Sequence, residues 1–402
     1  FNGTERTDDL AEIAIKIKDI NGNGKWDTDD YVLFYAKGPH LWHYNSNTVS
    51  HTYNIYSDVA TYFITIDRGN GLVLPTEASQ ITSSSAISSF DDWYLFEEEK
   101  NNLIYTELAA GAGTGRKWYG TQFNNISPNQ TINFTIPDII SSQPTIIQAR
   151  FAAAATDATS SFQVNNNGTA VFTKALSALA NSTYPDIATL GYYDGQILNP
   201  SSALNLEVKF ASGNPQGKGW LDYIEIIAKR NLKLNGSFVQ FRSFESLNNA
   251  ISKYRVQNAN TNTEIWDVTN GANIIKVNAS LSGSNIEFGR SSDILREYVA
   301  VDVSSSNFEV PKFVKSVANQ NLHGLPNIDY VIITIPEFRA AAQKLADFHN
   351  QNSGMSVRIV NVEEVYNEFS SGQQDLTAIR DFLKMFYDRN LSFDEKLKYV
   401  LL

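Results

Sequence analysis

A twelve-residue loop near the start of the chain carries the side chains best suited to bind a metal ion. Its positions 1, 3, 5, 7, 9 and 12 are occupied in order by Asp19, Asn21, Asn23, Lys25, Asp27 and Asp30, and Gly24 stands at position 6. Calcium loops with this spacing alternate short oxygen ligands, need a glycine for the sharp turn and take a backbone carbonyl at position 7. The sequence therefore predicts a structural calcium site, with an affinity of about 0.1–1 mM.

The segments that must position this loop have strand patterns, not the paired helices of an EF-hand. Residues 11–18 alternate apolar and polar side chains, and residues 31–38 form a second strand-like run. Position 12 holds Asp30, which is shorter than the usual glutamate and so favours bidentate ligation less. The alternative is a tight hairpin turn of Asn, Gly and Asp without a metal.

Other patterns that could carry chemistry are weaker. His40 and His43 have the spacing of a metal-binding pair on a helix, but the Gly-Pro before them predicts a loop or strand. The glycines at 111–115 lack the Gly-Lys-Ser/Thr ending of a phosphate loop. The sequence has no cysteine, which excludes disulfides, thiol catalysis and cysteine-ligated zinc within these 402 residues.

The composition indicates a β-rich protein with several domains. The 402 residues are 42% hydrophobic, 12% aromatic and 19% charged, and they are rich in Asn, Ser and Thr. A net charge of −11 argues against a nucleic-acid partner, because such a chain would not neutralise phosphates. No apolar run reaches the roughly 18 residues that a membrane span needs. The first residue is Phe and not Met, so we expect either that a signal peptide has been removed or that the sequence has been trimmed at this end.

The last part of the chain, residues 328–402, alternates strand and helix patterns. The apolar run at 330–335 predicts a strand, and the proline after it fits the first turn of a helix. A second strand at 357–360, a helix at 362–369, a helix capped by Asp375 and a final strand at 398–402 follow. The helix that begins after this proline is expected to bury the face formed by Phe338, Ala341, Leu345 and Phe348.

This order of elements predicts parallel strands joined by right-handed crossovers. Parallel strands of successive apolar residues are usually buried on both faces, so we expect residues 399–402 to lie inside a sheet. In open parallel sheets, chemistry gathers beyond the carboxyl ends of the strands. The sequence stops just before that place, and we expect it to be the front part of a longer protein.

The remaining sequence predicts β domains. Short strands at 131–136, 204–210 and 220–227 alternate with Asn, Ser, Gly and Pro turns, which favours a β-sandwich of jelly-roll type. Residues 53–67 are predicted as a strand pair, and residues 238–241 as one of several later strands. The expected division is an N-terminal β domain with the calcium-type loop, a β-sandwich, a small β domain with a linker, and a truncated α/β domain, at 1–115, 116–232, 233–325 and 326–402.

Several stretches also resemble the gingipain-type cysteine peptidases of family C25. They are DYVIITIPEF, SGMSVRIVNVEEVYNEFSSGQQDLTAIRDFLKMFYD and the terminal LKYVLL, supported by GKGWLDYIEIIAKRNL further upstream. Within this family they are most similar to the sortase of the type IX secretion system. The resemblance implies mainly β domains followed by the first half of a caspase/gingipain-like α/β domain. The catalytic His and Cys of that family lie further along, so they cannot be assigned to any residue here.

The resemblance implies a function for the whole protein. A cysteine endopeptidase and transpeptidase would remove the C-terminal sorting domain of secreted cargo and attach the cargo to anionic lipopolysaccharide at the cell surface, held by an outer-membrane β-barrel protein of the PorV type. Residues 1–402 alone are expected to be non-catalytic. The alternatives are a secreted gingipain-like protease and a calcium-stabilised carbohydrate-binding or adhesive surface protein.

Overall fold

The chain folds into two compact units. In the computed structural model, residues 9–45, 48–66, 69, 71–80, 85–102, 117–180, 187–389 and 397–402 are described. One unit consists of residues 1–75, 270–274 and 309–402, and the other of residues 76–269 and 275–308. The division into domains at 115, 232 and 325 stays a prediction.

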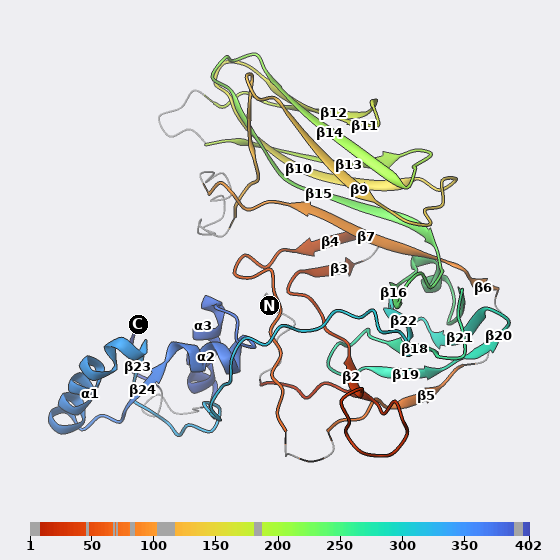
Figure 1. The fold of residues 1–402 in the computed structure, drawn as a ribbon. Coiled ribbons are helices and arrows are strands. Elements are labelled where there is room, and N and C mark those ends of the chain that lie inside the picture. The colour runs from red at the N-terminus through yellow and green to blue at the C-terminus, as the bar shows by residue number, and fades with distance from the viewer. Residues whose placement is uncertain are drawn as a thin grey trace. The chain divides into compact units, whose positions relative to one another are not determined.

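The second unit contains two β-sandwiches (Figure 1). In the first sandwich, one sheet has the order β13-β10-β15-β7, with β8 also pairing with β15, and the facing sheet has the order β12-β11-β14-β9. These strands are β7 (Ser89–Glu97), β8 (Gln122–Asn124), β9 (Asn129–Thr135), β10 (Thr145–Ala154), β11 (Ser160–Asn166), β12 (Thr169–Leu176), β13 (Thr189–Ile197), β14 (Ala203–Ser212) and β15 (Lys218–Asn231).

Alternating side chains fill the space between these two sheets. In β14, Leu204, Leu206 and Val208 are buried while the residues between them face outward, as expected for a strand with one apolar face. The rings of Phe151 and Phe162 stack with their centroids 4.5 Å apart. The strand predictions at 131–136, 204–210 and 220–227 are thus confirmed, and so is the β-sandwich.

The second sandwich also has two sheets, with the orders β16-β22-β18-β19-β5 and β20-β21-β17-β6. Its strands are β5 (Thr76–Ala78), β6 (Ala86–Ile87), β16 (Phe238–Phe241), β17 (Ile251–Gln257), β18 (Thr263–Asp267), β19 (Ile275–Asn278), β20 (Ser280–Ser282), β21 (Asn285–Ser291) and β22 (Tyr298–Asp302), with a 3₁₀ turn η2 (Phe244–Asn248). Four buried rings, Phe241, Tyr254, Phe288 and Tyr298, form its centre. The edge strands β5 and β6 pair parallel with β19 and β17.

The first unit contains two hairpins and a small α/β segment. The hairpins are β1 (Ile15–Lys18) with β2 (Tyr31–Phe34), and β3 (Leu41–Asn45) with β4 (Thr48–Thr52). The α/β segment has the parallel sheet β24-β23-β25. Its elements are β23 (Tyr330–Thr334), the 3₁₀ turn η3 (Pro336–Phe338), α1 (Arg339–Ser353), β24 (Val357–Asn361), α2 (Val362–Phe369), α3 (Leu376–Arg389) and β25 (Tyr399–Leu401).

Helices cover both faces of the parallel sheet, α1 on one side and α2 with α3 on the other (Figure 1). Gly354, in the left-handed conformation, ends α1, and Asn361 caps α2. The Asp375 Oδ1 atom accepts a 2.7 Å hydrogen bond from the Thr377 backbone N–H, which confirms its predicted capping role at α3. The predicted order of strands and helices, and their parallel pairing, are confirmed.

Two local predictions were wrong. Residues 53–66 form no strand. Helix α1 buries Ala342 and Ala346 against the sheet, while Phe348 remains 56% exposed, because the small alanines allow the helix to lie close to β23 and β24. The final strand β25 is parallel to β23, but Tyr399 and Leu401 are 53% and 42% exposed. Among the described residues β25 pairs with β23, and the interior position of this strand stays a prediction.

Candidate functional site

The predicted calcium loop connects β1 and β2. The antiparallel pair closes at Lys18 and Tyr31, so residues 19–30 form the connection. Gly22 and Gly24 have φ angles of +69° and +71°, a conformation that L side chains rarely adopt. Because of these two turns, the backbone N–H groups of residues 22–24 point toward one side chain. Asp19 accepts hydrogen bonds from the N–H of Gly22 (2.6 Å), Asn23 (3.3 Å) and Gly24 (2.7 Å).

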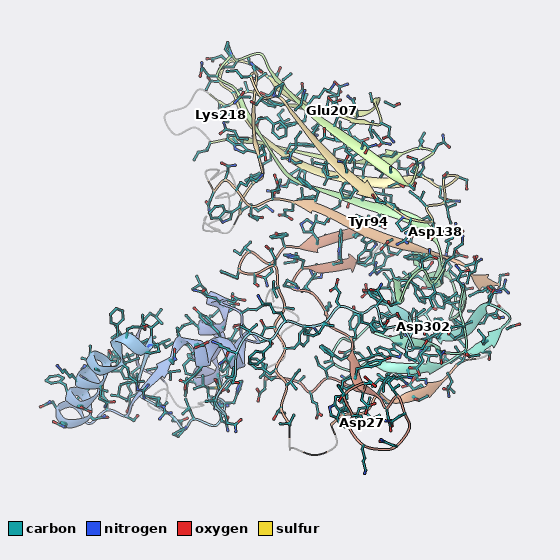
Figure 2. The ribbon with its side chains drawn as sticks, viewed as in Figure 1. Asp27, Tyr94, Asp138, Glu207, Lys218 and Asp302 are labelled. Atoms are coloured by element: carbon teal, nitrogen blue, oxygen red, sulfur yellow. The ribbon has the colours of Figure 1, made fainter. Side chains whose placement is uncertain are left out.

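Asp27 is the second centre of this loop, and Figure 2 labels it. Its Oδ2 atom accepts hydrogen bonds from the side-chain amides of Asn21 and Asn23, both at 2.6 Å. These two bonds lower the pKa of Asp27 below its ordinary value, and the bond from Asn21 has the larger effect. The loop thus brings the Asp27 carboxylate together with the Asn21 and Asn23 amides, while Asp19 binds the backbone of residues 22–24.

Asp30 and Lys25 have different positions. Both oxygens of Asp30 accept backbone hydrogen bonds, from Ile20 N–H at 2.8 Å and from Asp27 N–H at 2.7 Å, so Asp30 holds the base of the loop. The backbone N–H of Lys25 donates to Asn23 Oδ1 at 2.7 Å. The donor set fits a hard cation such as Ca²⁺, because turning an amide by 180° presents its oxygen in place of its nitrogen. Asp19, Asn21, Asn23 and Asp27 would hold the ion, and Asp30 fits less well.

The loop between α2 and α3 explains the longest motif of the sequence resemblance. Ser371 and Gly372 have φ angles of +51° and +79°, which turn the chain between the helices. Gln373 is 3% exposed; its amide nitrogen donates to Val59 O at 3.0 Å, and its oxygen accepts from the Asn54 side chain at 3.2 Å. The motif therefore specifies a docking contact for residues 54–59 within the first unit.

A cluster of buried charges on the first sandwich was not anticipated. Asp222 is fully buried, and its Oδ2 atom lies 3.2 Å from Lys117 Nζ and 3.1 Å from Arg150 Nη1. Lys117 is also 3.6 Å from Glu97. Burial is the largest cause that raises the pKa of Glu99 to about 8, and the hydrogen bond with Glu97 and the charge of Glu97 act in the same direction. Glu97 and Asp222 thus balance two cations, while the Glu99 carboxyl retains a proton at neutral pH.

The other sequence candidates are accounted for by ordinary contacts. His43 Nε2 lies 2.8 Å from Thr52 Oγ1, and His40 Nδ1 accepts the Asn54 N–H at 3.0 Å, so the two histidines do not share a ligand. The glycine run at 111–115 lies outside the described residues. No helix in the described part of the chain is long and apolar enough to cross a membrane.

The α/β segment is similar to a known protein family. Residues 323–402 match the family model of Peptidase family C25. The matched residues contain the parallel sheet and the helices that flank it, and the sequence resemblance to family C25 is confirmed. Among solved structures, the chain is similar to dimeric latent PorU from Porphyromonas gingivalis, with a TM-score of 0.78 and 23% identity. The match covers 98% of this chain and 37% of the PorU chain, so the described fold is that of part of PorU.

Two further solved structures match small parts of the chain. The carbohydrate-binding module CBM36 in complex with calcium and xylotriose has a TM-score of 0.23 at 9% identity and covers 34% of this chain and 98% of its own. The insecticidal delta-endotoxin Cry8Ea1 from Bacillus thuringiensis has a TM-score of 0.20 at 15% identity and covers 27% of this chain and 19% of its own. Neither similarity is close enough to carry an argument. No curated protein matches the sequence.

Proposed function

We propose that this chain is the N-terminal β region and the first βα units of a surface cysteine peptidase that acts as a sortase of the type IX secretion system. The observation that carries this proposal is the similarity to PorU over 98% of the chain, together with the separate match of residues 323–402 to the C25 peptidases. The chain spans 37% of the PorU chain, so the activity belongs to a longer polypeptide.

In this proposal, residues 1–402 support the catalytic groups and do not contain them. A cysteine peptidase attacks the scissile carbonyl with a thiolate that a histidine activates. The sequence contains no cysteine, so the thiol of the proposed enzyme lies outside these 402 residues. The carboxyl ends of β23 and β24, at Thr334 and Asn361, lie at the edge of the sheet where open α/β folds place their chemistry.

The proposed substrates and partners follow from the sortase function. The enzyme would cleave the C-terminal sorting domain from a cargo protein and transfer the new carboxyl end to anionic lipopolysaccharide. It would act at the cell surface, held by a PorV-like β-barrel protein of the outer membrane.

A cleavage assay tests this function. The full gene product and residues 1–402 are each incubated with a reporter that ends in a sorting domain, with and without a thiol-alkylating reagent. We expect cleavage by the full product, its loss on alkylation, and no cleavage by residues 1–402. Cleavage by residues 1–402, or by the alkylated full product, would contradict the proposal. Hydrolysis without transfer to lipopolysaccharide would favour a secreted protease.

We also propose that the loop of residues 19–30 binds Ca²⁺ as a structural ion. At free Ca²⁺ a few times above the dissociation constant, binding adds about 1 kcal/mol to the free energy of unfolding. Calorimetric titration with Ca²⁺ measures this directly. The Asp19→Ala variant should lose binding, because Asp19 also orders the backbone of residues 22–24. Equal melting temperatures of the wild type with Ca²⁺ and with chelator would exclude the site.

A further inference from the structure

Three metal-ligating side chains from distant parts of the sequence meet in the first unit. Within the residues that the structure describes, Asp9, His323 and Glu368 form a group whose ligand atoms all lie within 4.8 Å of one another. Asp9 precedes β1, His323 lies in the segment before β23, and Glu368 belongs to α2. This group is separate from the loop of residues 19–30.

The distances in this group are close to those of a metal centre. His323 Nδ1 lies 2.8 Å from Glu368 Oε2 and 3.6 Å from Asp9 Oδ1. Tetrahedral zinc with bonds of about 2.0–2.1 Å to nitrogen and oxygen keeps its ligand atoms roughly 3.4 Å apart. These two distances lie on either side of this value, and the Asp9 and Glu368 ligand atoms are also within 4.8 Å of each other, so small rotations of the side chains would admit an ion.

Neighbouring groups already hold two of the three ligands in place. Glu368 accepts hydrogen bonds from the Gln320 side chain (2.8 Å) and from the backbone N–H of Leu322 (2.7 and 2.9 Å) and His323 (3.2 Å). The His323 ring stacks on Phe369, with centroids 4.4 Å apart. Metal ligands are commonly oriented by such a surrounding layer of contacts.

Charge and burial agree with a divalent cation. Burial alone would raise the pKa of Glu368, but hydrogen bonds from Gln320, Leu322 and His323 lower it on balance, so the group is a carboxylate at neutral pH. The side chains of Glu368 and His323 are 8% and 16% exposed, whereas that of Asp9 is 62% exposed and offers an entry side. A divalent ion held by two carboxylates and an imidazole nitrogen would have its charge balanced by the carboxylates.

We propose that Asp9, His323 and Glu368 form a binding site for a zinc-class divalent transition metal, which fastens the N-terminal end of the first unit to α2. Imidazole nitrogen and carboxylate oxygen suit Zn²⁺ and its neighbours, whereas Ca²⁺ prefers more numerous oxygen ligands. Water would complete the coordination on the Asp9 side. Binding requires the imidazole nitrogen without its proton, so affinity falls as the pH is lowered.

Titration of the metal-stripped protein with Zn²⁺ tests the site, in the presence of Ca²⁺ to saturate the loop of residues 19–30. We expect one equivalent to bind and the melting temperature to rise. The His323→Gln and Asp9→Asn variants should each bind Zn²⁺ at least tenfold more weakly. Asp9→Asn serves as the second variant because Asp9 is exposed and its change leaves the packing around α2 intact. The matched control is His349→Gln, which changes a histidine on α1 outside the group and should leave Zn²⁺ affinity unchanged.

Replacement of Zn²⁺ by Co²⁺ gives a second readout. The visible absorption of Co²⁺ in low coordination should appear in the wild type and in His349→Gln, and it should be lost in His323→Gln and Asp9→Asn. Equal Zn²⁺ affinities for Asp9→Asn and His349→Gln would overturn the proposal, as would the absence of binding to the wild type at a hundredfold excess of metal. The group would then be an ion pair that holds a proton.

Discussion

Asp329 fastens together the beginnings of all three parallel strands, and its replacement by asparagine should weaken the sheet. Its carboxylate accepts hydrogen bonds from Lys398 Nζ (2.9 Å), Ser356 N–H (2.9 Å) and Ser356 Oγ (2.8 Å). Lys398 directly precedes β25, and Ser356 directly precedes β24. The hydrogen bond from Lys398, followed by those from Ser356, lowers the pKa of Asp329 from 3.8 to about 2.

This shift sets the expected magnitude. A change of almost two pKa units corresponds to at most about 2.5 kcal/mol of stability. The Asp329 side chain is 27% exposed, so solvent screening reduces the contribution to roughly 1–1.5 kcal/mol. Because the folded-state pKa is depressed, this stability is fully present above pH 3.8 and is lost as the pH falls through about 2.

Hydrogen exchange of the β23 amides in wild type and Asp329→Asn measures the effect locally. At pH 6, the opening free energy of residues 330–334 should fall by roughly 1–1.5 kcal/mol. A cycle with Lys398→Met separates the ion pair from the contacts with Ser356. Denaturant unfolding should show the difference between Asp329→Asn and wild type shrinking between pH 4 and pH 2. A variant as protected as the wild type at pH 6, or a difference that does not change with pH, would refute this role of Asp329.

Three further changes probe other parts of the chain. The pKa of Glu99 is raised to about 8, so the folded state keeps a proton that the unfolded chain loses, and the free energy of unfolding falls between pH 4.5 and 8. The Glu99→Gln variant should flatten this dependence. In urea unfolding at pH 8.5, it should add about 1–3 kcal/mol to the free energy of unfolding. A Glu99→Gln protein that is less stable than the wild type at that pH would contradict the raised pKa of Glu99. A Cβ atom at Gly219 would lie 2.6–2.7 Å from ring atoms of Phe210 and Phe162. Gly219→Ala should therefore lower the free energy of unfolding by about 1–3 kcal/mol, measured by calorimetry. An unchanged melting temperature would show that the core accommodates the added methyl group. Asp375→Ala removes the cap of α3 and should cost about 1–2 kcal/mol in denaturant unfolding, while Asp375→Asn retains most of it; equal losses for both would argue against capping.

Regular elements could be predicted because their signals are local. The strand at 238–241 was placed correctly from its apolar run, and Gly354 is recognisable as the end of α1 from the turn residues around it. The capping role of Asp375 also follows from its position before an apolar helical pattern. In each case, side-chain type and backbone conformation agree within a few residues.

The absence of strands at 53–66 has one local cause and one distant cause. Residues 53–66 have the apolar content of strands, but Asn54 Oδ1 accepts the N–H groups of Tyr56 (2.9 Å) and Ser57 (3.3 Å), and Gln373 binds Val59 O. These bonds replace the partners that a neighbouring strand would supply. A contact with a residue more than three hundred positions away leaves no periodic signal in the sequence.

The candidate sites divide in the same way. The loop of residues 19–30 could be found because its possible ligands are close in sequence, and the structure brings Asn21, Asn23 and Asp27 together as expected. The group of Asp9, His323 and Glu368 could not be found, because only the fold brings its members together. A single histidine and two separate carboxylates give no spacing to detect.

The two short edge strands of the second sandwich impose an order on synthesis. Ala86 in β6 pairs with Lys253 in β17, so about 170 residues must emerge from the ribosome before β6 has a neighbour. At 5–20 residues per second this delay is roughly 10–30 s, long enough for the first sandwich, which the chain completes by residue 231, to fold in the meantime. Nascent chains that expose residue 231 but not residue 251 outside the ribosome should therefore hold one finished β-sandwich, while β5 and β6 still lack their partner strands.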